Sequence, residues 1–253
     1  MLKVVILGSG NVGTYLVKRF EKSNDIKVVQ WYSRNLSNIN LISKSIIKTD
    51  NVDKLLEADI YIIAVNDDNI NELSSKFKFS NKLVCHTSGS KNLKELNSKN
   101  RRAVFYPIQT ISKTSNINTV KTPFCIECEK KEDYRILEKL CISIDSKFYN
   151  INSKQREKLH LAAVFVNNFT NQMYSIAKEI TDENNIDFNI LKPLILETAN
   201  KINNLDPKSV QTGPAIRGDF ETVKKHINNL TDSKHKSVYK ILSSLINKDY
   251  EKL

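Results

Sequence analysis

Apolar residues in the first 150 positions come in short runs separated by amphipathic stretches. The runs are typical of strands and fall at residues 3–8, 26–33, 59–65, 82–88, 102–107, 123–128 and 146–151. Patterns of helical period lie between them, at residues 11–23, 51–58 and 133–144. Strands that are apolar on both faces and alternate with helices predict a parallel sheet with helices on both sides.

After residue 150 the pattern changes to helices alone. Apolar positions of helical period extend over residues 154–181, 188–202, 220–230 and 236–246. We therefore predict an α/β domain over residues 1–150 and an all-helical domain over residues 151–253. The helix over 154–181 is apolar nearly all round, so we expect it to be buried on most sides, in part by a second subunit.

Glycine is scarce, and its placement marks three regions. Average usage predicts about 18 glycines in a chain of this length, and this chain has six. They are Gly8, Gly10, Gly13, Gly89, Gly213 and Gly218. Because Asn, Asp and Ser can make ordinary turns, we expect the glycines where no side chain fits.

The first glycine region matches a dinucleotide-binding pattern. Gly8, Gly10 and Gly13 form G-x-G-x-x-G between a predicted strand and a predicted helix. The glycines allow a tight turn and close approach of a pyrophosphate to the N–H groups at the helix start. We therefore predict an α/β Rossmann-type doubly wound sheet that binds a dinucleotide with Gly8, Ser9, Gly10, Asn11, Val12 and Gly13.

The second strand indicates which dinucleotide binds. An NAD site has an Asp or Glu about 20 residues after the glycines, whereas this chain has Ser33 and Arg34 in that region and no acid. A guanidinium binds a 2′-phosphate that a carboxylate would repel. Ser33 and Arg34 therefore predict NADP, with NAD as the less favoured cofactor.

Two further strand ends are expected to face the ligand, because ligands bind at the carboxyl ends of strands in open α/β sheets. Ala64 and Val65 end one strand and are predicted to contact the cofactor. The next strand ends in HTSGS, whose His86, Thr87, Ser88 and Gly89 are predicted to contact nicotinamide or substrate.

Each of these strand ends also has a structural interpretation. In HTSGS, Ser88 or Ser90 could instead cap a following helix. Asp67 and Asp68, which follow Val65, could be helix-start residues.

The apolar helix over 154–181 has polar exceptions on one broad face, namely His160, Asn167, Asn168 and Asn171. A buried amide without a hydrogen-bond partner costs a few kcal/mol, so we expect these residues to face a wet cleft, a ligand or one another. His160 is the candidate acid–base residue, since imidazole chemistry suits that task near neutral pH. The alternative is a structural histidine.

The last two glycines lie in the loop QTGPAIRGD. Pro214 and Asp219 fit a helix entry in which Asp219 caps the helix over 220–230. That interpretation leaves Gly213 and Arg217 unexplained, so we expect the backbone of this loop to approach a ligand. Thr212, Gly213 and Arg217 are the predicted substrate-binding residues, with Arg217 binding an anionic group.

These motifs occur in the order of a known family. The glycine loop, HTSGS, FYPIQTIS, KLHLAAVFVNNFTN, PLILET and QTGPAIRGD together resemble the bacterial family that joins a Rossmann-like domain to domain of unknown function 2520. That family is similar to pyrroline-carboxylate reductases, β-hydroxyacid dehydrogenases and deazaflavin-dependent NADP oxidoreductases. The resemblance implies an NADP-dependent oxidoreductase whose helical domain, similar to that of 6-phosphogluconate dehydrogenases, forms a homodimer.

Together with the resemblance, the candidate residues lead us to expect the following substrate and residue roles. A small, carboxylate-bearing carbonyl, imine or hydroxy substrate would bind between the domains. His160 would exchange a proton with it and Asn168 would hydrogen-bond its reacting atom, with Gln109 and Asn167 beside it. A deazaflavin coenzyme as co-substrate stays open, as does a non-catalytic NADP-binding sensor.

The sequence departs from the β-hydroxyacid dehydrogenases at one catalytic position. Those enzymes have a catalytic lysine four residues before an asparagine on the first long helix, and here Ala163 and Val164 stand at that spacing. A lysine mechanism therefore does not carry over.

Composition limits the remaining classes. The net charge is +11, but the lysines are dispersed and accompany abundant Asn and Ile, so we expect no nucleic-acid partner. No apolar run approaches the ~18 residues of a membrane span and no signal peptide is recognisable, so we expect a cytoplasmic protein without membrane contact. Cys125 and Cys128 form a C-x-x-C without a second pair, which predicts no metal site.

Overall fold

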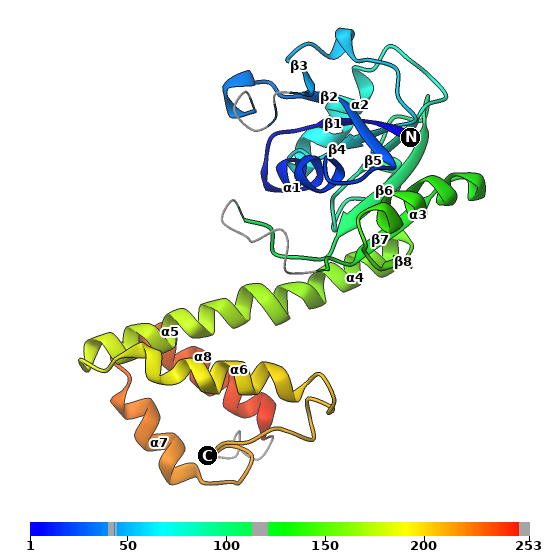
Figure 1. Cartoon of the computed structure of the whole chain (residues 1–253). Helices are drawn as coiled ribbons and strands as arrows, with labels where there is room; N and C mark the ends of the chain where they lie inside the picture. Colours follow the sequence, from blue (N-terminus) through cyan, green and yellow to red (C-terminus); the bar gives the residue numbers. More distant parts are fainter. Residues whose placement is uncertain (40–42, 44, 113–120, 248–253) are drawn as a thin grey trace. The chain divides into compact units, whose positions relative to one another are not determined.

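The chain forms two compact units, Met1–Asn167 and Asn168–Leu253. The computed structural model describes residues 1–39, 43, 45–112 and 121–247. The first unit contains all the strands of the described residues, and the described part of the second is helical (Figure 1). The sequence predicts the division after residue 150, whereas here the helix that follows β8 belongs to the first unit, because its buried Arg156 pairs with Glu127 of the sheet.

One eight-stranded sheet, in the order β3-β2-β1-β4-β5-β6-β7-β8, forms the centre of the first unit. The strands are β1 (Leu2–Leu7), β2 (Ile26–Tyr32), β3 (Ile47–Thr49), β4 (Ile60–Ile63), β5 (Leu83–His86), β6 (Arg101–Pro107), β7 (Phe124–Cys128) and β8 (Phe148–Asn150). The order turns back between β1 and β4, and such a switch point is where open α/β sheets bind their ligands.

Neighbouring strands are parallel except β6 and β7. In that antiparallel pair Ala103 lies opposite Cys128 and Pro107 lies opposite Phe124. The predicted parallel sheet thus contains one antiparallel pair, because an apolar strand pattern does not record the direction of the strand.

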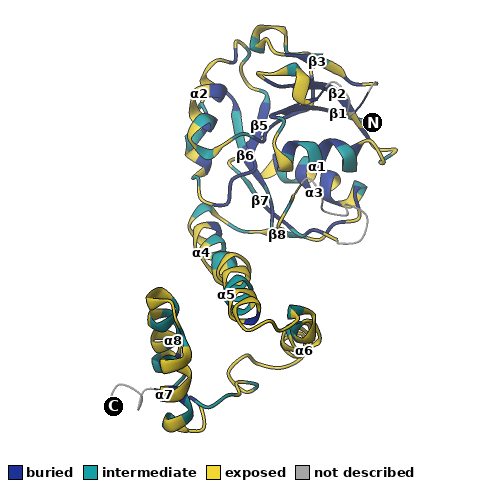
Figure 2. Cartoon of the chain, turned by 90° about the vertical axis from the view of Figure 1, so that its left-hand side faces the viewer, coloured by how far each residue is buried: buried dark blue, intermediate teal, exposed yellow. Residues whose placement is uncertain are grey.

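Helices cover both faces of the sheet. In Figure 2, α1 (Asn11–Phe20) and α3 (Tyr134–Ser143) lie on one face and α2 (Ile70–Ser75) lies on the other. Alternate residues of β1 enter separate cores, with Val4 and Ile6 in one and Val5 and Leu7 in the other. This arrangement explains why the strand is apolar at successive positions.

The helix predicted over residues 51–58 is absent, and a single 3₁₀ turn, Val52–Lys54, occupies its start. Side chains from β2 and β4 form hydrogen bonds with the backbone of residues 54–58, where the predicted helix would have continued. Gln30 donates to the oxygen of Lys54 and accepts from the N–H of Leu56. The Tyr61 hydroxyl accepts from Ala58 and donates to Leu56. Tertiary hydrogen bonds thus replace the helical ones.

The long helix predicted over residues 154–181 is interrupted. It consists of α4 (Ser153–Ala163), a π-helical segment (Val164–Phe169) and α5 (Thr170–Glu183). Asn152 and Gln155 form a capping box at its start. The π segment has more residues per turn than an α-helix, so positions after Val164 do not keep the α-helical register from which one shared polar face was predicted.

The helical unit continues with α6 (Lys192–Lys201), α7 (Phe220–Asn229) and α8 (Ser233–Ile246). Asp219 caps α7 by accepting from the N–H of Thr222, which confirms that prediction. Most side chains of this unit are exposed or half-buried (Figure 2). Among the described residues, no helix is long and apolar enough to cross a membrane.

Candidate functional site

The loop between β1 and α1 has a conformation that requires glycine at two positions. Gly8 has a φ of +123°, and a Cβ there would collide with the carbonyl oxygen of Ala64. A Cβ on Gly13 would collide with the carbonyl oxygen of Gly8. The buried indole of Trp31 donates to that same oxygen over 2.8 Å. The loop is therefore held in one tight turn.

Gly10 serves a different purpose, because a Cβ there would meet nothing within 4 Å. Gly10 is the N-cap of α1, which has no side-chain cap and no acidic residue in its first turn. The first N–H groups of α1 are therefore left for an anion, and the helix dipole favours negative charge there. This is the arrangement that binds a pyrophosphate.

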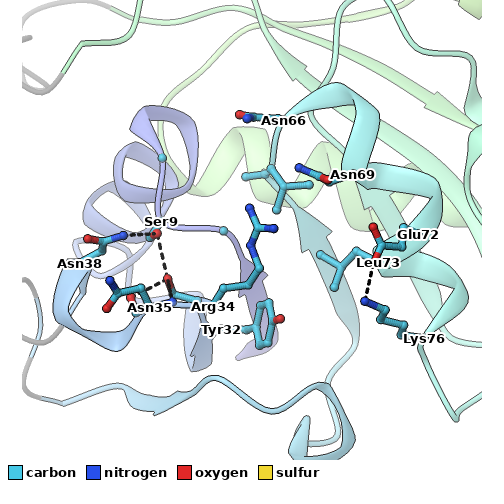
Figure 3. Close-up of a pocket in the computed structure, with 15 residues that line it drawn as sticks. Ser9, Tyr32, Arg34, Asn35, Asn38, Asn66, Asn69, Glu72, Leu73 and Lys76 are labelled. Atoms are coloured by element: carbon cyan, nitrogen blue, oxygen red, sulfur yellow. Dashed lines mark hydrogen bonds and ion pairs between the residues drawn. The ribbon is translucent and has the colours of Figure 1, made fainter.

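A pocket of about 330 Å³ opens at the carboxyl ends of β1, β2 and β4, and its size suits a nucleotide. Of the predicted cofactor residues, it is lined by Gly8, Ser9, Gly10, Ser33, Arg34, Ala64 and Val65. Asn11, Val12 and Gly13 form the first turn of α1 instead. The Arg34 side chain extends into the middle of the pocket (Figure 3).

Hydrogen bonds connect the turn after β2 to the glycine loop. The Ser33 hydroxyl donates to the Ser9 hydroxyl over 2.9 Å, and Asn38 donates to the same Ser9 oxygen over 3.5 Å. The carboxylate in this pocket is Glu72 of α2, which pairs with Lys76, the residue that follows this helix. Lys76 lowers the pKa of that carboxyl by a hydrogen bond and by its charge. Arg34 thus lines the pocket together with the hydroxyls of Ser9 and Ser33.

The loops after β4 and β5 are joined through Asp67. Its Oδ2 accepts from the Ser88 hydroxyl over 2.8 Å and from the Ser90 hydroxyl over 2.6 Å. The N–H of Thr87 donates to Ile63 over 3.2 Å. Neither serine caps a helix, since Asn92 caps the 3₁₀ turn that follows. These loops therefore form one connected edge beside the glycine loop.

His86 lies inside this edge with no exposed surface. Its Nδ1 accepts from the N–H of Ser88 over 3.1 Å, and its Nε2 lies 3.3 Å from the oxygen of Asn92. Burial, followed by the charge of Arg156, lowers the pKa of His86 to about 4. The structure therefore places His86 as a neutral support of the HTSGS loop.

The side chains of His160 and Tyr106 both pack against Gly89, at the same edge of the sheet. The Tyr106 hydroxyl lies 3.2 Å from Nδ1 of His160, and both side chains are half-buried. A Cβ on Gly89 would lie 2.7 Å from Cζ of Tyr106 and 2.8 Å from Nδ1 of His160. The sequence alone did not single out Tyr106, although it lies in the predicted strand 102–107 and in the motif FYPIQTIS.

The remaining predicted substrate residues lie elsewhere in the chain. Gln109 is exposed after β6, and its side chain accepts from the N–H of Thr110. Asn167 ends the first unit, while Asn168, Thr212, Gly213 and Arg217 belong to the helical unit. Gly213 and Gly218 have φ values of +115° and +69°, so backbone conformation accounts for both glycines without a ligand. Arg217 is exposed in that loop.

The cysteines are free, and burial raises the pKa of all four thiols. Cys125 and Cys128 lie on opposite faces of β7, since neighbouring side chains of a strand alternate. Within the described part of the chain, no three His, Cys, Asp or Glu side chains are grouped to hold a metal ion.

Comparisons with known proteins agree with this geometry. Residues 3–88 match the family "NADP oxidoreductase coenzyme F420-dependent", and residues 122–246 match "domain of unknown function (DUF2520)". A candidate NADP oxidoreductase from Bacteroides fragilis has a similar structure, with 34% identity, 98% of each chain covered and a TM-score of 0.87. The sequence matches none of the curated proteins compared with it.

More distant structures share the fold. A protein from Thermotoga maritima is 18% identical, with 98% of each chain covered and a TM-score of 0.74. Pyrroline carboxylate reductase from Plasmodium falciparum, whose structure has NADP bound, is 15% identical, with 97% of this chain and 98% of that chain covered and a TM-score of 0.65.

The fold and the glycine loop define a Rossmann-type protein of the dinucleotide-binding class. Within that class, the chain belongs to the NADP oxidoreductase family, and its C-terminal part matches domain of unknown function 2520. The predicted family and fold class are thereby confirmed.

Proposed function

We propose that the protein is an NADP-dependent reductase or dehydrogenase of a small carbonyl, imine or hydroxy compound. The observation that carries this proposal is the glycine loop beside Arg34. The loop leaves the N-terminus of α1 open to an anion, and Arg34 extends into the adjoining pocket.

The residues present fit NADP better than NAD. Gly8, Gly10 and the first turn of α1 would hold the pyrophosphate. Arg34 and the hydroxyl of Ser33 would bind the 2′-phosphate, because a guanidinium forms paired charge-assisted hydrogen bonds with phosphate. Glu72, the carboxylate of the pocket, is already paired with Lys76 and lies on α2 rather than at the end of β2.

The nicotinamide half would lie along the edge formed by the loops after β4 and β5, because a dinucleotide crosses the switch point of the sheet. When bound, NADPH supplies a hydride to the carbonyl or imine carbon and leaves as NADP⁺. His160 would give the proton that the adjoining oxygen or nitrogen needs, or take it in the reverse direction. It stands at this edge against Gly89.

The identity of the substrate is proposed only as a class. A small compound that carries a carboxylate fits the prediction that Arg217 binds an anion. Its carbonyl, imine or hydroxyl group fits the prediction that Asn168 hydrogen-bonds the reacting atom. Both residues belong to the helical unit, so their roles stay predictions.

Titration of the purified protein with NADPH and NADH, followed by cofactor fluorescence, tests the cofactor. We expect Arg34→Ala to weaken NADPH binding about 10–100-fold, since a charged hydrogen bond contributes ~1.5–3 kcal/mol, and to leave NADH binding nearly unchanged. Lys78→Ala is the matched control, because Lys78 is exposed and lies outside the pocket lining. Equal binding of both cofactors by the wild type would contradict the proposal.

A further inference from the structure

The pair formed by Tyr106 and His160 joins two segments that are distant in sequence. Tyr106 belongs to β6, and His160 lies in the second half of α4. Their rings meet edge to face, with centroids 6.1 Å apart and an interplanar angle of 76°. The contact that orients them is the one between the Tyr106 hydroxyl and Nδ1 of His160, 3.2 Å apart.

The direction of this hydrogen bond follows from the partners of the hydroxyl. Among the described residues, the Tyr106 hydroxyl has one hydrogen-bond partner, Nδ1 of His160. Burial raises the pKa of Tyr106, so the phenol keeps its proton. A half-buried hydroxyl hydrogen needs an acceptor, and an unprotonated imidazole nitrogen provides one. We infer that the hydroxyl donates to Nδ1 and that the neutral ring carries its own proton on Nε2.

We propose that Tyr106 is a positioning residue that fixes His160 with Nε2 as the nitrogen that faces the substrate and exchanges the proton. This inference rests on the proposed function, because it names the atom of His160 that performs that step. No hydrogen bond from the described residues occupies Nε2 of His160.

The pair remains engaged in both protonation states of the ring. When His160 is doubly protonated, the hydroxyl turns and accepts from Nδ1–H, because a phenol is both donor and acceptor. The Nε2–H bond would then break as the substrate oxygen or nitrogen takes the proton, and the carbon would receive its electron pair as the hydride that bound NADPH supplies. The ring stays in place throughout, which is what positioning contributes to catalysis.

Gly89 supplies an independent way to break the pair. A methyl group at this position would lie within 2.9 Å of the Tyr106 hydroxyl oxygen and within 2.8 Å of Nδ1 of His160. Since ordinary contacts of a methyl group are longer than these, both rings have to move away from it. Gly89→Ala therefore disrupts the hydrogen bond while both side chains remain.

The test is long-range ¹H–¹⁵N NMR of the histidine rings in the free, full-length protein at a pH where His160 is neutral, with His160→Gln to assign its signals. In the wild type we expect an unprotonated, hydrogen-bonded Nδ1 and a protonated Nε2. Tyr106→Phe and Gly89→Ala should both shift the Nδ1 signal toward that of a nitrogen without a hydrogen bond.

The chain contains a matched control pair. Nδ1 of His226 lies 2.8 Å from the Tyr239 hydroxyl in the helical unit, so Tyr239→Phe should shift the signals of His226 and leave those of His160 unchanged. A protonated Nδ1 in wild-type His160, or the wild-type spectrum in Tyr106→Phe, would overturn the inference. Failure of the proposed function is recognised separately, as absence of NADPH binding by the wild type.

Discussion

The buried ring of His86 makes the stability of the protein sensitive to acid. In the folded chain both ring nitrogens are engaged and the pKa is lowered to about 4, whereas an exposed histidine has a pKa near 6.5. The main cause is burial, followed by the charge of Arg156; Asn92 and Asp67 act in the opposite direction.

Acidification should therefore destabilise the wild type more than a variant without this ring. Above pH 6.5 the ring is neutral in both states and contributes no pH dependence. As the pH falls from 6.5 to about 4, the unfolded chain takes up a proton that the folded chain does not, so the free energy of unfolding falls by about 3 kcal/mol. Urea unfolding of the wild type and His86→Gln at several pH values measures the difference. Parallel pH profiles would contradict the assignment, and His235→Gln is the control.

Glycine scarcity was the most informative signal of the sequence at the scale of single residues. It correctly marked Gly8, Gly13 and Gly89 as positions where a Cβ collides with its neighbours. It could not separate these from Gly213, where a Cβ meets open space and a positive φ is the reason for glycine. Tyr106 was not predictable, because its role depends on a contact with a ring 54 positions away in sequence.

At the scale of elements, the buried ion pair between Arg156 and Glu127 holds α4 against the sheet. The Arg156 side chain is 1% exposed and pairs with Glu127, which is 15% exposed. Arg156 also donates to the carbonyl oxygen of Lys91 over 2.6 Å. These bonds hold the start of α4 against β7 and the loop after β5. His160 follows Arg156 in the same helix, so its position depends on them.

Glu127→Gln should destabilise the first unit by about 3–5 kcal/mol, because it leaves the buried guanidinium without its counter-charge. Chemical denaturation followed by circular dichroism measures the loss. Asp53→Asn is the matched control, since its pair with Lys78 is exposed by 75% and 49% and should contribute less than about 1 kcal/mol. An equal effect of the two substitutions would show that α4 is not held by this pair.

The period of the apolar positions predicted most of the strands and helices, but not the hydrogen bonds and contacts between them. The apolar runs located β1, β2 and β4 because buried parallel strands are apolar on both faces. The failed helix at residues 51–58 has a sequence of helical period, and its backbone instead bonds to Gln30 and Tyr61. Gln30 comes from a strand 24–26 residues away, and Tyr61 reaches this backbone only because its own strand, β4, follows directly, so the period of the segment itself does not reveal either partner.

At the scale of the whole molecule, the described residues of the helical unit form no hydrophobic core of their own. Among its described residues, the buried apolar side chains are Ala215 and Val223. Large apolar side chains are exposed instead, at Phe169, Ile180, Ile186, Ile190, Leu194, Leu196, Ile202, Leu205, Ile216, Ile241, Leu242 and Leu245. Isolated helices with this much exposed apolar surface are not stable in water, so another surface has to cover them.

We propose that a second copy of the chain covers these helices, since the resemblance noted in the sequence implies a homodimer and a two-fold interface pairs like surfaces. Light scattering coupled to gel filtration should give twice the chain mass of 29.0 kDa. The double variant L194E/L245E should shift the protein toward monomer and lower its helix content, because a charge on each apolar surface opposes burial. The control I47E/I142E changes side chains of similar exposure, 57% and 69%, in the α/β unit and should leave the mass unchanged. A wild type that is a stable monomer at micromolar concentration would refute the dimer.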